Sequence, residues 1–348
     1  MTEGKIRKSN FELLRIIAML MIVTSHYCVH GNQFSNAFNI NFDGIFIHSG
    51  ILGNLGVDIF FMISGYFLSK SQKPFKLHKA LSLIFQVWLY STSIALFLTL
   101  VFKLDIGKAN LIKALFPTTF YEYSFFTVYL LIYALSPFLN LVINNISKKE
   151  YLILIAVFLL FVSLPETLLG RMYLDSYFID GITCYFIGGG IEHLTFSSRK
   201  WGNFLVIAVS WIALGIVDSF LHNMSSQFDG IHFYSRIAIP TLLIAATLLS
   251  WFESANIKQN KCINFFAKHT FGIFLIHDNN YVRDLLWKRL LDNSNYHGLI
   301  LVLDCLICVV SVFVCCALLD VIRSLVQDEL EKLITWVYRK LRLPIIEL

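Results

Sequence analysis

The sequence predicts an all-α fold, a polytopic membrane helical bundle of about ten transmembrane helices with both termini in the cytoplasm. Of the 348 residues, 57% are hydrophobic and 15% are charged, whereas soluble domains have about 45–50% apolar and about 25% charged residues. Apolar runs of helical length recur between short polar stretches, which is typical of a helical bundle and not of a membrane barrel. The Lys and Arg residues cluster in alternate loops.

Ten apolar runs can be assigned as spans. They cover residues 11–29, 52–69, 80–102, 124–143, 151–168, 177–194, 203–221, 236–252, 270–291 and 299–322. With the N-terminus in the cytoplasm, 19 of the 28 Lys and Arg residues fall on the cytoplasmic side, seven fall outside and two lie within spans. This distribution obeys the positive-inside rule and favours an even number of spans.

We expect one membrane domain, residues 1–323, followed by a short cytoplasmic segment, residues 324–348. Apolar residues between Ser324 and Leu341 fall on one helical face, which predicts an amphipathic helix on the inner leaflet. The net charge of +5 follows the membrane topology, so we expect contact with the lipid bilayer and none with nucleic acid. Neither HExxH nor a spaced Cys/His set is present, and no metal is expected. The oligomeric state stays open.

The first span contains Arg15 and His26. A charged or titratable side chain in hydrocarbon costs several kcal/mol, so such residues usually face a protein interior and mark a site. The two residues are eleven positions apart, about three helical turns, which places them on one stripe about 16 Å apart along the axis. The helix therefore presents a cation near its start and an imidazole near its end.

The second span carries Asp58, followed two turns later by the tripeptide Ser64–Tyr66. A carboxylate at this depth needs a partner. Two interpretations remain open. Asp58 forms a structural ion pair with Arg15 or another neighbour, or it orients or charges His26, as the partner of a catalytic base does in many active sites. The glycine between Ser64 and Tyr66 allows another backbone to approach closely.

The ninth predicted span is unusually polar, because His277 is followed by Asp278 and by further polar residues up to Asp284. This helix is expected to lie inside the bundle or to be partly unwound. Taken alone, His277 fits a satisfied core residue as well as a site residue.

Three further features are weaker. Glu122 stands at the outer mouth of the fourth span, and Tyr234 and Arg236 are expected in a solvated loop beside the eighth. The triple glycine at 188–190 lacks the strand–loop–helix setting of a phosphate loop, so close helix packing or unwinding of the helix is favoured there.

Taken together, these residues resemble the acyltransferase 3 family of integral membrane acyltransferases. The resemblance covers nearly the whole chain, with five stretches in the family's order. They are Arg15 and His26 with ten residues between them, GVDIFFMISGYFL at 56–68, the basic loop after it, YSFFTVYLLIYALSPFLN at 123–140, and FGIFLIH at 271–277. The resemblance implies transfer of an acyl group, most often acetyl from acetyl-CoA, to hydroxyls of a cell-surface or lipid-linked carbohydrate.

Carried over by motif, the resemblance implies that Arg15 and His26 are the essential pair, supported by Asp58, Ser64, Tyr66 and His277, and we count Asp58 with the catalytic residues. From their charge and position in the chain, we also expect Arg15, Lys73, Lys76 and Lys79 to bind acetyl-CoA, and Glu122 and Asp278 to contact substrate or support the site. Family members commonly have arginines in the basic loop, whereas the lysines here attract phosphate as point charges without the bidentate fork. Asp278 stands where the family often has proline.

A sugar hydroxyl is a poor nucleophile at neutral pH, and the oxyanion that develops from a thioester needs stabilisation. His26 is therefore expected to act as a general base on the hydroxyl or as a nucleophile that carries the acyl group, and both routes stay open. We expect a multi-pass protein of the cell membrane, and the abundance of Ile, Asn, Lys and Phe is typical of an AT-rich bacterial genome. The acceptor, the acyl group and the side of transfer are not determined.

The alternative is a transporter or flippase of a lipid-linked or polymeric glycan. Buried Arg, Asp and His residues suit a proton-coupled carrier as well, but no duplicated halves are evident in the chain. A glycan polymerase would predict longer, Arg-rich outer loops than this chain has.

Overall fold

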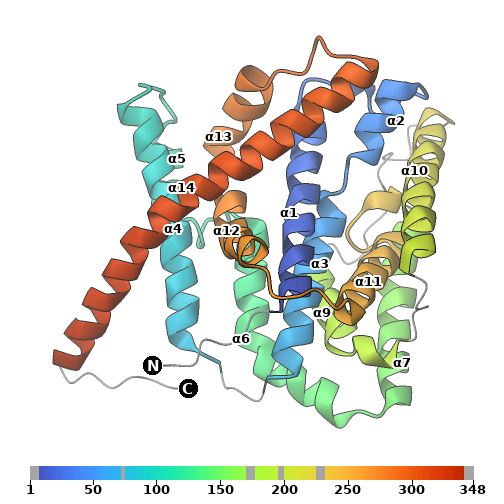
Figure 1. Ribbon diagram of the computed structural model, residues 1–348, viewed down its shortest axis with the longest axis horizontal. Helices are drawn as coiled ribbons and strands as arrows, with labels where there is room; N and C mark the ends of the chain where they lie inside the picture. The colour runs from blue at the N-terminus through green and yellow to red at the C-terminus, as the bar shows by residue number, and fades with distance from the viewer. Residues whose placement is uncertain (1–7, 72–74, 170–176, 195–199, 225–231, 341–348) are drawn as a thin grey trace.

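The computed structural model describes residues 8–71, 75–169, 177–194, 200–224 and 232–340, without the side chains of 200–203, 232 and 328–340. Every regular element in this part of the chain is helical, which confirms the all-α class (Figure 1). The longer helices are α1 (Ser9–His30), α3 (Gly53–Ser69), α4 (Leu77–Leu100), α6 (Ser124–Asn145), α7 (Lys148–Phe158), α9 (Tyr177–Gly189), α10 (Lys200–Met224), α11 (Ile239–Ser254), α12 (Lys261–His277) and α14 (Gly298–Lys340). The shorter ones are η1 (Phe34–Asn36), α2 (Phe42–Ser49), α5 (Lys108–Leu115), η2 (Leu159–Ser163), α8 (Leu164–Leu169), η3 (Ile191–His193), η4 (His232–Tyr234), α13 (Asn280–Asp284) and η5 (Leu285–Leu290).

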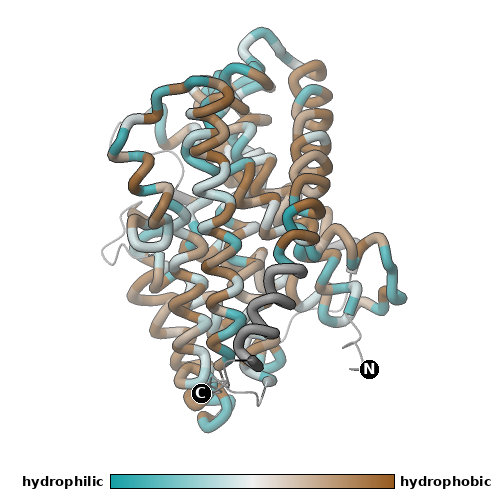
Figure 2. Tube along the Cα trace, turned by 90° about the vertical axis from the view of Figure 1, so that its left-hand side faces the viewer, coloured by the Kyte–Doolittle hydropathy of each residue, from teal (hydrophilic) through white to brown (hydrophobic). Residues whose placement is uncertain are grey.

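Seven helical segments in the described residues are long and apolar enough to cross a membrane, which supports the membrane-bundle class. They are Ser9–His30, Phe42–Ser69, Leu77–Leu100, Ser124–Asn145, Lys148–Leu169, Phe204–Met224 and Gly298–Gln327. Hydrophobic residues dominate these helices, and hydrophilic ones gather at the connections (Figure 2). The apolar helix α11 is shorter, and α9 and α12 have 13 and 17 residues. The predicted count of ten spans is thus not confirmed.

Residues 270–291 do not form one continuous helix, which agrees with the expectation of a partly unwound ninth span. Helix α12 begins earlier, at Lys261, and ends at His277, after which Asn279 accepts a hydrogen bond from the Tyr281 N–H and caps the short helix α13. Short polar side chains compete for backbone hydrogen bonds, so a run of them interrupts a helix. His277 consequently lies at the C-terminal end of a helix and not two turns inside one.

The backbone of α14 passes Ser324 without a break and continues to Lys340. The segment predicted as a separate amphipathic helix is therefore joined to the last span. Its side chains beyond 327 and residues 341–348 lie outside the described residues, so its placement on a leaflet stays a prediction.

Helix α1 lies in the middle of the bundle and packs against α3, α11, α12 and α14 (Figure 1). Its buried face includes Leu14, Ala18, Ile22 and Val23. The other stripe of α1, which carries Arg15 and His26, is half-buried. The central helix therefore contributes one face to the core and leaves another for the site.

Two glycines bring α3 and α9 into backbone contact. A Cβ on Gly65 would overlap the carbonyl oxygen of Tyr185, and a Cβ on Gly188 would overlap that of Met62. Small residues allow membrane helices to approach this closely. The predicted packing role of Gly65 and of the first glycine of the triplet is confirmed.

A buried aspartate joins three helices on another side of α1. Asp320 of α14 accepts a hydrogen bond from the Tyr90 hydroxyl of α4 at 2.7 Å, and its Oδ2 lies 2.7 Å from Nδ1 of His269 of α12. Arg323 also contacts both carboxylate oxygens, at 2.9 and 3.0 Å. Gly272 lies against this carboxylate, and a Cβ there would overlap it. The network fixes the position of α12, the helix that ends at His277.

We expect Gly188→Ala to destabilise the bundle by about 1–3 kcal/mol, because the added methyl group separates α3 from α9. The measurement is thermal unfolding of the purified protein in detergent. Ala156→Leu on the exposed face of α7 is the control and should leave the unfolding temperature unchanged. Equal unfolding temperatures for the Gly188 variant and the unsubstituted protein would contradict this packing.

Candidate active site

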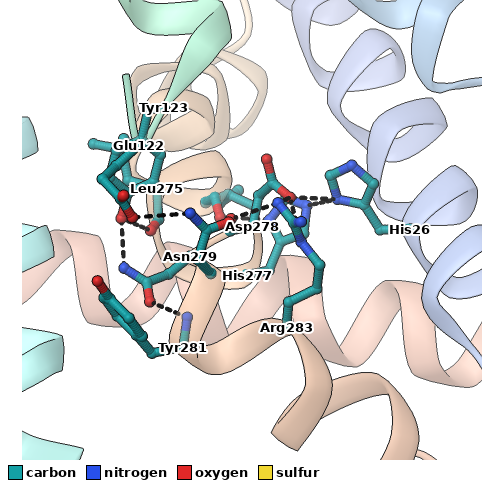
Figure 3. A network of polar contacts seen from close by, with 11 residues as sticks. His26, Glu122, Tyr123, Leu275, His277, Asp278, Asn279, Tyr281 and Arg283 are labelled. Atoms are coloured by element: carbon teal, nitrogen blue, oxygen red, sulfur yellow. Dashed lines mark hydrogen bonds and ion pairs between the residues drawn. The ribbon is translucent and has the colours of Figure 1, made fainter. Parts of the chain in front are cut away.

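Two histidines from distant parts of the chain meet between α1 and α12. His26 lies one turn before the end of α1, and its Nδ1 is 3.0 Å from Nε2 of His277, the last residue of α12 (Figure 3). His277 is fully buried, whereas the His26 side chain is 17% exposed. One ring is thus held inside the protein, and the other retains access to a reacting group.

The contacts of His277 assign the protons of both rings. Its Nδ1 lies 2.6 Å from the carbonyl oxygen of Ile273, and a carbonyl only accepts, so Nδ1 carries the proton. In a neutral ring Nε2 is then an acceptor, and His26 Nδ1 donates its proton to it. The remaining nitrogen of a neutral His26, Nε2, is left with a lone pair, as a base or nucleophile requires.

A carboxylate and a guanidinium complete this group. Asp278 Oδ1 lies 3.6 Å from His26 Nδ1 and accepts hydrogen bonds from Arg283 Nη2 at 2.7 Å and Nε at 3.2 Å. Both side chains are partly exposed, at 16% for Asp278 and 30% for Arg283. The arginine thereby orients Asp278 toward the histidine and balances its charge.

The end of α12 is held in place by α6. The Tyr123 hydroxyl, at the start of α6, donates to the carbonyl oxygen of Leu275 at 3.0 Å and accepts from Asn279 Nδ2 at 2.7 Å (Figure 3). Nearby, Asn280 Nδ2 donates to Glu122 Oε2 at 2.9 Å. These hydrogen bonds pair the backbone and side-chain polar groups at the point where the helix ends. They thereby fix the position of His277, which lies between Leu275 and Asn279.

Arg15 lies on the same helix as His26 but nearer its other end. Its guanidinium binds Glu12 at 2.7 Å and lies 5.6 Å from the ring centre of Phe67, and the side chain is 29% exposed. The eleven-residue separation corresponds to about 16 Å of helix. The two predicted residues therefore share one helix without direct contact.

Neither specific partner foreseen for Asp58 is found. Asp58 is fully buried, and among the described residues neither of its oxygens accepts a hydrogen bond from nitrogen or oxygen. The charges that act on it are Asp180 and Arg236, while His26 is paired with His277. Of the two interpretations of Asp58, interaction with neighbouring charges is therefore favoured. A role in orienting His26 is disfavoured, because His26 already has His277 as its partner.

Arg236 and Tyr234 do not lie in a solvated loop. Arg236 donates to Asp180 at 3.0 Å and lies 3.8 Å from the ring centre of Tyr177, while Tyr234 is fully buried and stacks on Trp211. That expectation was wrong because a short polar run beside a span looks the same in sequence whether it packs inward or outward.

The remaining predicted residues are spread over the bundle. Ser64 donates to the Phe60 carbonyl of its own helix at 2.8 Å, and the Tyr66 hydroxyl donates to Glu253 at 3.2 Å. Lys76 and Lys79 lie at the start of α4, where Lys79 is exposed. Lys73 lies outside the described residues. These hydrogen bonds of Ser64 and Tyr66 do not involve the histidine pair, and Tyr66 stacks on Phe11, one turn before Arg15 on α1.

One group of side chains has the composition of a metal site. His26, His30 and Asp278 each offer a ligand atom, and these atoms all lie within 4.8 Å of one another. His30 follows His26 by one turn, with ring centres 5.1 Å apart. The sequence did not reveal this group, because Asp278 comes from another helix; the only signal was the spacing of two histidines by four residues.

The family model Acyl_transf_3, described as an acyltransferase domain, matches residues 8–320, most of the chain. No match was found among curated proteins or among solved structures. The match includes α1, α12 and the histidine pair. The chain therefore belongs to the acyltransferase 3 family and is a membrane acyltransferase.

Proposed function

We propose that this protein transfers an acetyl group from acetyl-CoA to a hydroxyl of a cell-surface or lipid-linked carbohydrate. The observation that carries the proposal is the contact between His26 and His277. In this contact Nδ1–H of His26 donates a hydrogen bond to His277, and the lone pair of His26 Nε2 stays available. A partly exposed imidazole with a fixed tautomer is suited to general-base chemistry. The family match supports acyl transfer, and it gives no support to the alternative of a glycan transporter.

The donor is proposed to enter from the end of the bundle where Arg15 lies. Arg15 and the lysines Lys73, Lys76 and Lys79 would neutralise the phosphates of acetyl-CoA. Lysine ammonium groups are suited to this role, because they attract phosphate as point charges at the mouth of a site. From there the pantetheine arm would run along α1 toward His26, a rise of about 16 Å. This arrangement separates phosphate binding from acyl transfer by the length of one helix.

In the proposed step, Nε2 of His26 removes the proton of the acceptor hydroxyl as its oxygen attacks the thioester carbonyl. The tetrahedral intermediate collapses, the carbon–sulfur bond breaks, and the CoA thiolate takes the proton from His26. The products are an O-acetyl ester and CoA with a free thiol. An acyl-histidine route would use the same lone pair, and release of CoA before acceptor is added would distinguish it.

The first test is His26→Ala, for which we expect acetyl transfer to fall by about 10²–10⁴-fold, because the general base is removed. Transfer of radiolabelled acetyl from acetyl-CoA to membrane glycan is measured with purified protein in lipid nanodiscs, without any ion gradient. His297→Ala, at an exposed histidine outside the site, is the matched control and should keep full activity.

Wild-type transfer by the His26→Ala variant would refute the assignment of the base. Failure of the unsubstituted protein to use acetyl-CoA in any assay would refute the proposed donor. Comparison of surface polysaccharide by proton NMR between a deletion strain and its complement identifies the acceptor, since O-acetyl methyl signals disappear only where the enzyme acts.

The second test concerns the donor. Replacing Lys76 and Lys79 together by Ala should raise KM for acetyl-CoA by about 10- to 100-fold with kcat little changed, because each charged contact with phosphate stabilises binding and not the reaction. Replacing Lys148 and Lys149 at the start of α7 is the matched control. Equal KM values for the two double variants would contradict the proposed phosphate contacts.

A further inference from the structure

We propose that His26, His30 and Asp278 form an inhibitory binding site for a divalent transition-metal ion such as Zn²⁺. Binding of the ion follows from the geometry alone, and inhibition rests on the proposed role of His26. The ion is a regulator and not a cofactor, because it binds the imidazole ring whose other nitrogen is the base that the reaction needs.

The geometry fits a small coordination sphere. In tetrahedral zinc sites with bonds of about 2.1 Å the ligand atoms lie about 3.4 Å apart, and His26 Nδ1 is already 3.6 Å from Asp278 Oδ1. All three ligand atoms lie within 4.8 Å, so movements of about 1 Å close the site. Histidines four residues apart project from the same face of a helix.

His30 gives an independent indication of a ligand. Among the described residues it has no hydrogen-bond partner, although its ring lies 5.1 Å from that of His26 and one of its nitrogens lies within 4.8 Å of an Asp278 oxygen. A half-buried imidazole with an unused lone pair beside a second imidazole and a carboxylate is a ready ligand. Two nitrogens and one oxygen are the donor set that Zn²⁺ and its neighbours in the first transition series prefer.

Arg283 sets the strength of binding. Its guanidinium is 2.7 Å from Asp278 Oδ1, so a dication entering the site meets a positive charge a few ångströms away. This repulsion limits affinity to the reversible range expected of a regulator. A metal on Nδ1 of His26 also replaces the hydrogen bond to His277, and the proton that Nδ1 carried moves to Nε2, which then has no lone pair. The base is lost without any change of fold.

The experiment measures Zn²⁺ binding to the purified full-length protein in nanodiscs, by competition with a chromophoric chelator, and repeats it with Co²⁺, whose visible absorption reports coordination. The unsubstituted protein should bind one ion. His30→Ala should weaken binding more than about 100-fold, and Arg283→Gln should strengthen it about tenfold or more because the repelling charge is gone. His297→Ala removes a histidine elsewhere and should have no effect.

Acetyl transfer is then measured with added Zn²⁺. The unsubstituted protein should lose activity and recover it with EDTA, while His30→Ala should stay active at the same Zn²⁺ concentration. Equal Zn²⁺ affinity of His30→Ala and the unsubstituted protein, or no saturable binding below about 1 mM, would overturn the site. His30-dependent binding without inhibition would leave the site standing and refute His26 as the base, so the two failures are distinguishable.

Discussion

The contact between His26 and His277 is the interaction on which the rest of the site depends. It links the central helix to a helix that ends at the site, and it fixes which nitrogen of His26 is free. Its geometry is maintained from both directions along α12. Asp320 holds the middle of that helix against α4 and α14, and Tyr123 holds its end. A buried polar network of this kind is stabilising only when its members are paired, as the members on α12 are.

The sequence allowed a correct prediction of the fold class, and it singled out both histidines as candidates without predicting their contact. Polar residues inside apolar runs are conspicuous, so His26 and His277 stand out in the sequence. Their pairing joins positions 251 residues apart, and no local spacing reports such a distance. Asp58 shows the same limit, because a carboxylate on one helix has many candidate partners and the sequence does not say which helix faces it.

The positions of other features could not be predicted, for local reasons. The helix break after His277 arises from side-chain capping by Asn279, which competes with the strong apolar signal of the residues on either side. Asp320 lies near the end of an apolar run, where a charge looks like the edge of the membrane, although it is fully buried and bound to His269 and Arg323. Only burial distinguishes a charge in an interior network from a charge at an exposed helix end, and burial is a property of the assembled bundle.

His277 accepts a hydrogen bond from Nδ1–H of His26 and thereby leaves Nε2 of His26 free to act as a base. This assignment is tested most directly by comparing acetyl transfer by His277→Gln and His277→Ala, with thermal unfolding as a check that both variants fold. The glutamine carbonyl can still accept the hydrogen bond, so this variant should retain much of the wild-type rate, whereas the alanine variant should lose about 10²-fold or more. Wild-type rates for both variants would contradict the account.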